Sequence, residues 1–210
     1  MLCVQHISPK KARAIAQEII AIDRKFESVI QRSGTAPIGQ ERSKVTNFHA
    51  LAESILSQQL SIKAADTIVA RVNSLAGGRL SAEGIAKLND RQLRNAGCSG
   101  AKSRALRELS QATLDKSIPM RNLHRLTDEE ISTFLLPLFG IGRWTVEMFL
   151  IFQLGRLDIW PVGDLGVRRG WERIHRLKEE ITPTELEMKG DKFAPYRSHV
   201  AWYCWRALEN

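Results

Sequence analysis

Apolar residues recur every three or four positions along most of the chain, which is the period of an amphipathic helix. Ile15, Ile19 and Ile22 begin one such series, and Phe48 and Leu51 begin another. We find no convincing segment with the period of two that is typical of a half-buried strand. The pattern therefore predicts an all-α fold.

Turn and cap residues place several helix boundaries. Thr127 with Glu130, and Thr182 with Glu185, have the spacing of capping boxes, in which each side chain accepts the backbone N–H of the other residue. Residues 34–47 form the main polar break. We expect residues 1–45 to be an N-terminal helix and connector that belong to the same fold as the rest of the chain, residues 1–210.

Composition narrows the class of partner. The chain has 31 Lys and Arg against 23 Asp and Glu, a net charge of +8. A polyanion fits this charge, and nucleic acid fits better than a membrane because no segment reads as a basic interfacial helix. A solvated basic surface explains the charge equally well.

The three cysteines, Cys3, Cys98 and Cys204, are scattered and odd in number, which is typical of reduced thiols. No clustered Cys or His pattern predicts zinc or an iron–sulfur cluster. No apolar stretch approaches the roughly 18 residues of a membrane span. We therefore expect a cytoplasmic protein, at the nucleoid in a bacterium or in the nucleus of a eukaryote.

The most informative segment is residues 135–171. Gly140-Ile141-Gly142 lies between two apolar stretches of helical period, which predicts a helix-hairpin-helix. Two glycines let the backbone turn sharply and approach a phosphate, and the first N–H groups of the second helix then face the anion. Taken alone, a glycine pair between helices is more often only a turn.

The residues that follow make the motif more specific. Trp144-Thr145 lies in the second helix, and Pro161-Val162-Gly163-Asp164 with Leu165-Gly166-Val167 comes about twenty residues later. This arrangement resembles the helix-hairpin-helix DNA glycosylase superfamily, and within it the 3-methyladenine DNA glycosylase II (alkylbase DNA glycosylase) family. The resemblance spans residues 46–207 and recurs at residues 55–65, 96–102 and 195–198. One departure is Phe139, where the family usually has proline.

The resemblance implies two helical lobes with an active-site cleft between them. It also implies a monofunctional glycosylase that flips alkylated purines such as 3-methyladenine out of duplex DNA and hydrolyses the N-glycosidic bond. An abasic site would remain for base excision repair. The alternative is a noncatalytic helix-hairpin-helix DNA-binding protein, which would have no need of the carboxylate at Asp164. A protein-interaction scaffold would explain neither the glycines nor their spacing to Asp164.

Asp164 follows a turn and precedes an apolar segment, so by position alone it is an ordinary N-cap residue. In the family pattern, the aspartate of Asp-Leu-Gly is catalytic. A carboxylate at the positive end of a helix stays ionised, as is required to stabilise an oxocarbenium-like sugar and to orient a water. Asp158 is the alternative carboxylate, and we expect it to face solvent.

Trp144 indicates the class of mechanism. Relatives that cleave the strand through a Schiff base place a lysine at this position, and an indole cannot act as that nucleophile. Trp144 and Trp205 match pocket aromatics of the family, which suit a cationic alkylated purine. The other candidates for the base pocket are Met148, Trp160 and Tyr196, and any of these side chains could instead be core.

Gln58-Gln59 falls at a helix end, where the family inserts a side chain between bases. Gln59 aligns better as this wedge, although a helix-end pair bonded to nearby backbone is as good a reading of either residue. The residues predicted to bind the DNA backbone are Gly140, Ile141, Gly142, Arg143, Thr145 and Lys102. We expect a monomer that requires no cofactor, with a monovalent cation between the hairpin and a DNA phosphate as an optional ligand.

Overall fold

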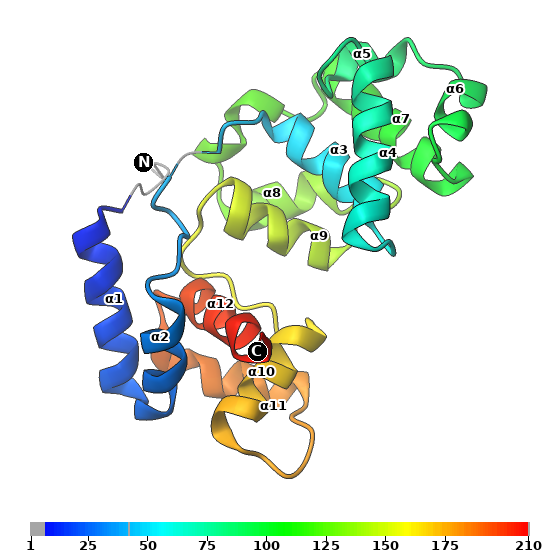
Figure 1. Cartoon of the computed structure of the whole chain (residues 1–210). Helices are drawn as coiled ribbons and strands as arrows, with labels where there is room; N and C mark the ends of the chain where they lie inside the picture. Colours follow the sequence, from blue (N-terminus) through cyan, green and yellow to red (C-terminus); the bar gives the residue numbers. More distant parts are fainter. Residues whose placement is uncertain (1–6, 42, 210) are drawn as a thin grey trace. The chain divides into compact units, whose positions relative to one another are not determined.

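The computed structural model describes residues 7–41 and 43–209, and in these residues every regular element is helical (Figure 1). The prediction of an all-α fold is confirmed. The chain divides into two compact units. We call residues 43–149 the hairpin unit, and residues 7–41 together with 150–209 the terminal unit.

The hairpin unit is built from seven α-helices and one short 3-10 turn. In chain order these are α3 (Asn47–Ser57), α4 (Ile62–Leu75), α5 (Ala82–Ala86), α6 (Asp90–Asn95), α7 (Gly100–Leu114), the 3-10 turn Met120–Arg125, α8 (Asp128–Leu135) and α9 (Arg143–Met148). Helix α3 packs against α4 and α7 (Figure 1). Leu51, Leu56 and Leu106 are completely buried along these contacts, so the apolar stripes of the helices form the core of this unit.

The terminal unit combines the two ends of the chain. Its elements are α1 (Pro9–Ile22), the 3-10 turn Arg24–Phe26, α2 (Glu27–Ser33), most of a π-helical turn (Phe149–Gln153), α10 (Leu165–His175), α11 (Pro183–Gly190), the 3-10 turn Asp191–Phe193 and α12 (Arg197–Leu208). Helices α10 and α12 pack against each other (Figure 1). A Cβ at Gly170 would lie 2.0 Å from the carbonyl oxygen of Cys204, so only glycine permits this close approach of the two helices.

The N-terminal region differs from its prediction in one respect. The apolar series that begins at Ile15 was expected to form one helix, but α1 ends at Ile22 and α2 begins at Glu27. The side chain of Asp23 accepts the N–H of Lys25, which starts a 3-10 turn between the two helices. A local side-chain bond of this kind competes with helix propagation. Both predicted capping boxes, which begin α8 and α11, are present.

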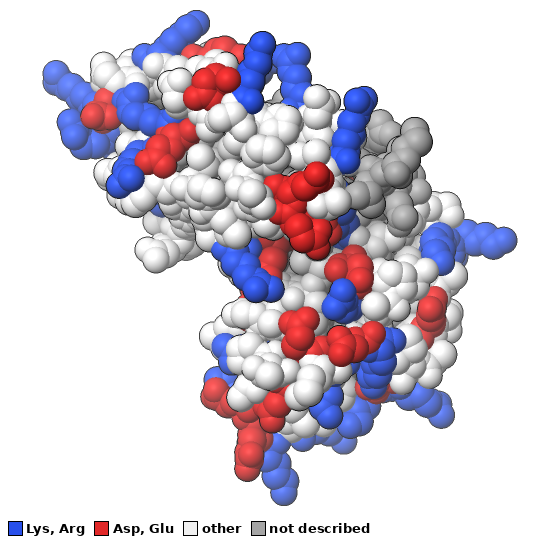
Figure 2. Space-filling view, turned by 180° about the vertical axis from the view of Figure 1, so that it is seen from behind, with Lys and Arg blue, Asp and Glu red and all other residues white. Residues whose placement is uncertain are grey.

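Charge is mixed over the surface that Figure 2 shows, where Lys and Arg side chains lie among Asp and Glu. The net charge of +8 therefore does not by itself mark a binding face there. No helix within the described part of the chain is long and apolar enough to cross a membrane.

His199 lies in the core of the terminal unit, on α12, with 1% of its surface exposed. Neither ring nitrogen has a hydrogen-bond partner among residues 7–41 and 43–209. Burial lowers the pKa of His199 to about 4, because a charged imidazolium would lose its hydration in the core.

This histidine should make the protein sensitive to mild acid. Its pKa is higher in the unfolded chain, near 6.5, so the unfolded state binds the proton first. Its contribution is complete above pH 6.5 and decreases as the pH falls towards 4, by about 3 kcal/mol in total. In urea denaturation at pH 7 and pH 4.5, His199→Gln should show the smaller loss of unfolding free energy. Equal losses in the parent and the variant would contradict this assignment.

Candidate functional site

The predicted helix-hairpin-helix is present in the hairpin unit, where α8 leads through a turn into α9. Gly140 has a φ of 79°, and a Cβ at this position would lie 2.8 Å from the Cβ of Ala105 on α7. Gly142 is the N-cap of α9, and a Cβ there would meet nothing within 4 Å. The first glycine is therefore required by conformation and packing, whereas the second leaves the helix start open to approach.

The other hairpin residues divide between core and surface. Ile141 and Thr145 are buried, with 4% and 3% of their surfaces exposed. The Thr145 hydroxyl lies 3.4 Å from the Nε2 atom of Gln58. These contacts do not support the predicted role of Thr145 in binding the DNA backbone. Arg143 is largely exposed and forms an ion pair with Glu147, with 2.9 Å between Nε and Oε1.

Gln58 and Gln59 have different environments at the end of α3. The Nε2 atom of Gln58 donates to the carbonyl of Gly140 at 2.9 Å, so this side chain is bonded to the hairpin. Gln59 is exposed and has a φ of 57°, in the left-handed region. Gln59 is thus the more exposed of the two side chains and stays the predicted wedge, whereas Gln58 is bonded to the hairpin.

The structure places Lys102 differently from its prediction. Its ammonium donates to the carbonyl of Leu56, in the last turn of α3, at 2.7 Å. The side chain is half-buried, and burial lowers its pKa. Lys102 therefore supports the end of α3, where Gln58 and Gln59 follow, and its contacts are not those of a phosphate-binding lysine.

Asp164 is held at the start of α10 in the terminal unit. Its Oδ1 atom accepts the N–H of Val167 at 2.8 Å and the indole N–H of Trp205 at 3.0 Å. The first bond is an N-cap, as the position predicted. The second comes from α12 and fixes the rotation of the carboxylate. An aspartate in this position combines a defined orientation with the positive end of a helix dipole.

Gly166 makes room for this pair of side chains. A Cβ at Gly166 would lie 2.9 Å from Cδ1 of Trp205 and 3.0 Å from Oδ1 of Asp164. The glycine of Asp-Leu-Gly thus allows the indole to reach the carboxylate.

Phe152 is a candidate aromatic that the sequence analysis did not find. It is 53% exposed, and its ring centroid lies 5.6 Å from that of Trp205 with an interplanar angle of 34°. Trp205 is half-buried between this ring and Asp164. The terminal unit therefore presents an exposed aromatic ring next to the indole that bonds the predicted catalytic carboxylate.

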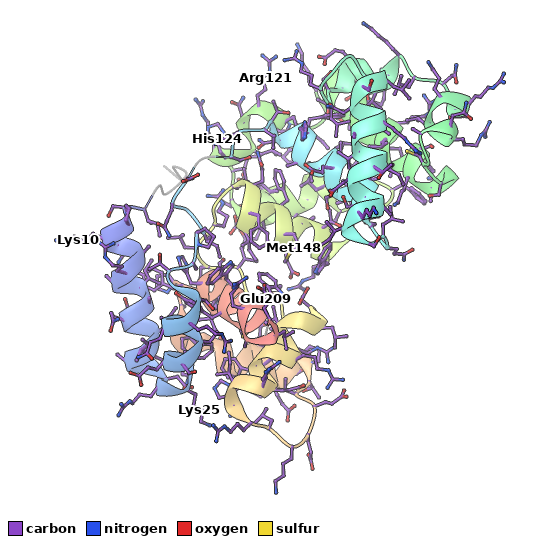
Figure 3. All side chains as sticks on the ribbon, in the orientation of Figure 1. Lys10, Lys25, Arg121, His124, Met148 and Glu209 are labelled. Carbon is purple, nitrogen blue, oxygen red and sulfur yellow. The ribbon has the colours of Figure 1, made fainter. Side chains whose placement is uncertain are left out.

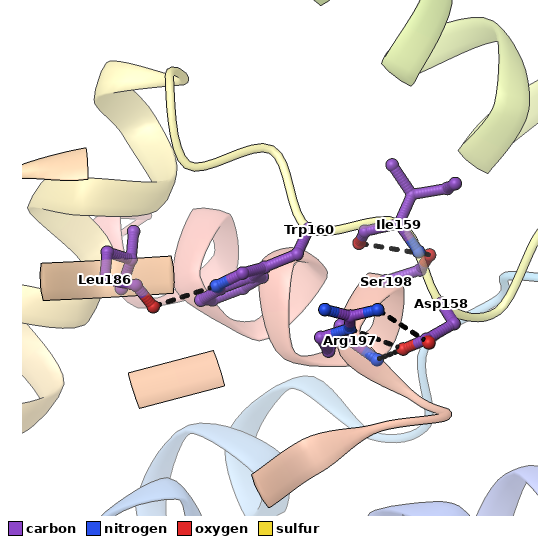
Figure 4. Close-up of polar contacts among 6 residues, drawn as sticks. All are labelled: Asp158, Ile159, Trp160, Leu186, Arg197 and Ser198. Atoms are coloured by element: carbon purple, nitrogen blue, oxygen red, sulfur yellow. Dashed lines mark hydrogen bonds and ion pairs between the residues drawn. The ribbon is translucent and has the colours of Figure 1, made fainter. Parts of the chain in front are cut away.

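The structure gives the four other predicted pocket residues different environments. Trp160 is 5% exposed, and its indole N–H donates to the carbonyl of Leu186 at 2.9 Å, as a core residue does (Figure 4). Tyr196 is bonded to Lys11, with 2.7 Å between Nζ and the phenol oxygen. These contacts do not support a base-pocket role for either residue. Met148 is half-buried at the end of α9 (Figure 3), and Trp144 in the same unit is 49% exposed.

Asp158 was expected to face solvent, but in the structure its carboxylate is bonded to Arg197. Arg197 binds it through two parallel contacts of 2.8 Å, and Ser198 accepts the N–H of Ile159 at 2.8 Å (Figure 4). Both carboxylate oxygens of Asp158 are therefore engaged by the guanidinium. These bonds fix the segment that leads to Asp164, and they leave Asp164 as the better candidate for chemistry.

Among the residues that the structure describes, no three His, Cys, Asp or Glu side chains are grouped so that they could hold a metal ion. The candidate residues fall into two sets. The hairpin, Gln58, Gln59 and Trp144 lie in the hairpin unit, and Asp164, Trp205 and Phe152 lie in the terminal unit.

Comparison with known proteins gives close relatives. The chain is 33% identical over 188 residues to DNA-3-methyladenine glycosylase 1 of Schizosaccharomyces pombe, covering 88% of this chain and 82% of that protein. A solved structure of the 3-methyladenine DNA glycosylase Mag1 from the same yeast, in complex with abasic DNA, superposes with a TM-score of 0.81 at 32% identity. That match covers 93% of this chain and 95% of the other.

A crystal structure of a DNA-3-methyladenine glycosidase from Bacillus halodurans is also similar. It is 35% identical with a TM-score of 0.79, and the match covers 90% of this chain and 86% of that one. The family model for HhH-GPD superfamily base excision DNA repair proteins matches residues 52–195, a range that contains both the hairpin and Asp164. The chain therefore belongs to the HhH-GPD superfamily of base excision DNA repair proteins.

Proposed function

We propose that the protein is a monofunctional DNA glycosylase that removes alkylated purines such as 3-methyladenine from duplex DNA. The observation that carries this proposal is the held carboxylate of Asp164, bonded through Oδ1 to Val167 and Trp205 beside the exposed ring of Phe152. The names of the relatives from fission yeast and Bacillus halodurans support the substrate class.

Each group has a defined part in the proposed reaction. A purine alkylated at N3 or N7 carries positive charge, so its glycosidic bond is weakened and an aromatic ring attracts it. Phe152 and Trp205 would stack on the flipped base. Trp144 would contribute a further aromatic ring to the base pocket, as the sequence predicts. The Asp164 carboxylate would stabilise the oxocarbenium-like sugar and orient the attacking water. The released base and an abasic site are the products.

In this proposal the hairpin binds the DNA backbone at the start of α9, where Gly142 leaves the helix terminus open. Gln59 fills the space left by the flipped nucleotide, and Gln58 holds the hairpin. A noncatalytic DNA-binding protein would have no need of a carboxylate held by Val167 and Trp205, as Asp164 is.

No cofactor takes part in the proposed reaction, and a monovalent cation between the hairpin and a phosphate would be an optional ligand. The carbonyls of Leu138, Gly140 and Gly142 each accept one hydrogen bond within the unit. Each carbonyl oxygen has a second lone pair, which a cation would use. No step of the proposed reaction depends on this ion.

The test is incubation of the protein with duplexes that each carry one modified base, followed by alkali to cleave abasic sites. Strand cleavage should appear for duplexes with alkylated purines and not for the undamaged duplex. DNA binding without cleavage of any of these duplexes would favour the noncatalytic alternative.

The absence of a Schiff-base lysine gives a further prediction. Position 144 holds an indole, and the Lys102 ammonium is bonded to the carbonyl of Leu56. The strand should therefore remain intact until alkali is added, and borohydride should trap no covalent protein–DNA adduct. A known glycosylase/lyase is the positive control. An adduct that is lost in Lys102→Gln or Lys63→Gln would contradict the monofunctional assignment.

A further inference from the structure

Helix α7 makes a closed set of contacts with the residue that precedes the two hairpin glycines. Oε2 of Glu108 accepts the backbone N–H of Phe139 at 2.9 Å, and Oε1 accepts Nε of Arg104 at 2.8 Å. The Arg104 guanidinium carbon lies 4.0 Å from the centroid of the Phe139 ring. We call these three residues the Phe139 clamp.

The clamp acts on the turn where its conformation is most constrained. Ala105 lies beside Arg104 on α7 and leaves no room for a Cβ at Gly140, which has a φ of 79°. Helix α7 thus fixes two successive residues, Phe139 by a hydrogen bond and Gly140 by contact. From the end of α3, Gln58 holds the carbonyl of the same glycine. The backbone that leads into α9 is therefore set by side chains from two other helices.

Glu108 places a negative charge next to the hairpin turn that is proposed to bind phosphate. A carboxylate beside a phosphate-binding turn repels DNA, so its presence there needs a compensating benefit. The pKa of Glu108 is lowered, first by the N–H of Phe139 and then by Arg104, so the carboxylate is ionised at neutral pH. A charged acceptor makes a stronger hydrogen bond to the N–H than a neutral one. Arg104 offsets the repulsion and covers the ring of Phe139.

We propose that Glu108 is a positioning residue for DNA binding, which fixes the hairpin by accepting the N–H of Phe139 while Arg104 neutralises its charge. The inference rests on the proposed function, in which the hairpin binds the DNA backbone. It predicts a loss of affinity when Glu108 is truncated to alanine and the Phe139 N–H loses its acceptor. Simple electrostatics predicts the opposite, because the truncation removes a negative charge from a DNA-binding surface.

The experiment measures binding of undamaged duplex and of duplex with an abasic-site analogue, by fluorescence anisotropy at fixed salt. Glu108→Ala should bind both duplexes about five- to tenfold more weakly, the size expected from losing one charge-assisted hydrogen bond. Its single-turnover rate at saturating damaged DNA should equal that of the parent. Glu108→Gln retains an acceptor oxygen and should recover most of the affinity.

Glu53→Ala is the matched control, because Glu53 also pairs with a basic side chain four residues away, His49 on α3, at 3.5 Å. This variant should bind at least as tightly as the parent. Gly142→Asp separates the two proposals. If it binds weakly while Glu108→Ala binds like the parent or more tightly, the hairpin contacts DNA and the positioning role is overturned. If both variants bind normally and melt normally, the hairpin proposal fails, and the positioning role fails with it.

Discussion

Replacing Asp164 by asparagine should reduce the rate of base release by about 10³-fold or more, the size of effect expected when a major electrostatic contribution to a transition state is removed. The Oδ1 atom of Asp164 accepts both the Val167 N–H and the Trp205 indole N–H. An asparagine carbonyl can accept the same two bonds. The variant should therefore keep its fold and the shape of the site while losing the charge that stabilises the sugar cation.

Single-turnover release of 3-methyladenine, detected by alkaline cleavage, is the measurement. Affinity for a duplex with an abasic-site analogue should remain close to that of the parent. Asp191→Asn is the control, because it removes an exposed carboxylate from the same unit without touching Asp164. An Asp164→Asn protein that released the base at the parental rate would remove the catalytic role and favour a binding protein.

The sequence predicts those parts of the structure that are determined by residues close together in the chain. The helices follow from apolar periodicity, and the caps at Thr127, Thr182 and Asp164 follow from side chains that bond N–H groups three residues later. The hairpin also follows locally, because Gly140 needs its positive φ wherever the rest of the chain lies.

Tertiary contacts explain where the sequence predictions were weak. Lys102 bonds a carbonyl 46 residues earlier in the chain, and Trp160 bonds one 26 residues later. Lys102 was predicted to bind the DNA backbone and Trp160 to line the base pocket, whereas a distant backbone carbonyl accepts the side-chain N–H of each residue. Such an acceptor leaves no signal in the pattern around the donor itself.

Phe152 was missed for a different reason. Residues 149–152 are all apolar, so periodicity does not indicate which of them faces solvent. The segment forms a π-helical turn, which changes the angular spacing of its side chains from that of an α-helix. Phe149, Leu150 and Ile151 are buried, and Phe152 is half exposed. A helical wheel drawn with the α-helical period does not describe this turn.

The second large effect is expected at the hairpin, where Gly142→Asp should lower the affinity for any duplex, damaged or not. Gly142 is the N-cap of α9, has a φ of −97° and has open space where a Cβ would lie. Aspartate is a favoured N-cap residue and glycine is only slightly worse, so the variant should be as stable as the parent or more stable by about 0.3 kcal/mol. Its carboxylate would occupy the place proposed for a phosphate, and repulsion should weaken binding about 30-fold at low salt.

Gly142→Asn is the matched control, because it adds a side chain of the same size and capping ability without the charge. The difference in affinity between the two variants isolates the electrostatic part. That difference should shrink as salt is raised, because ions screen the exposed carboxylate from phosphate. Equal affinities for Gly142→Asp and the parent, with normal thermal melting, would show that the hairpin does not contact DNA. Equal losses in both variants would instead mean that the bulk of the side chain, and not its charge, blocks the approach of the phosphate to the start of α9.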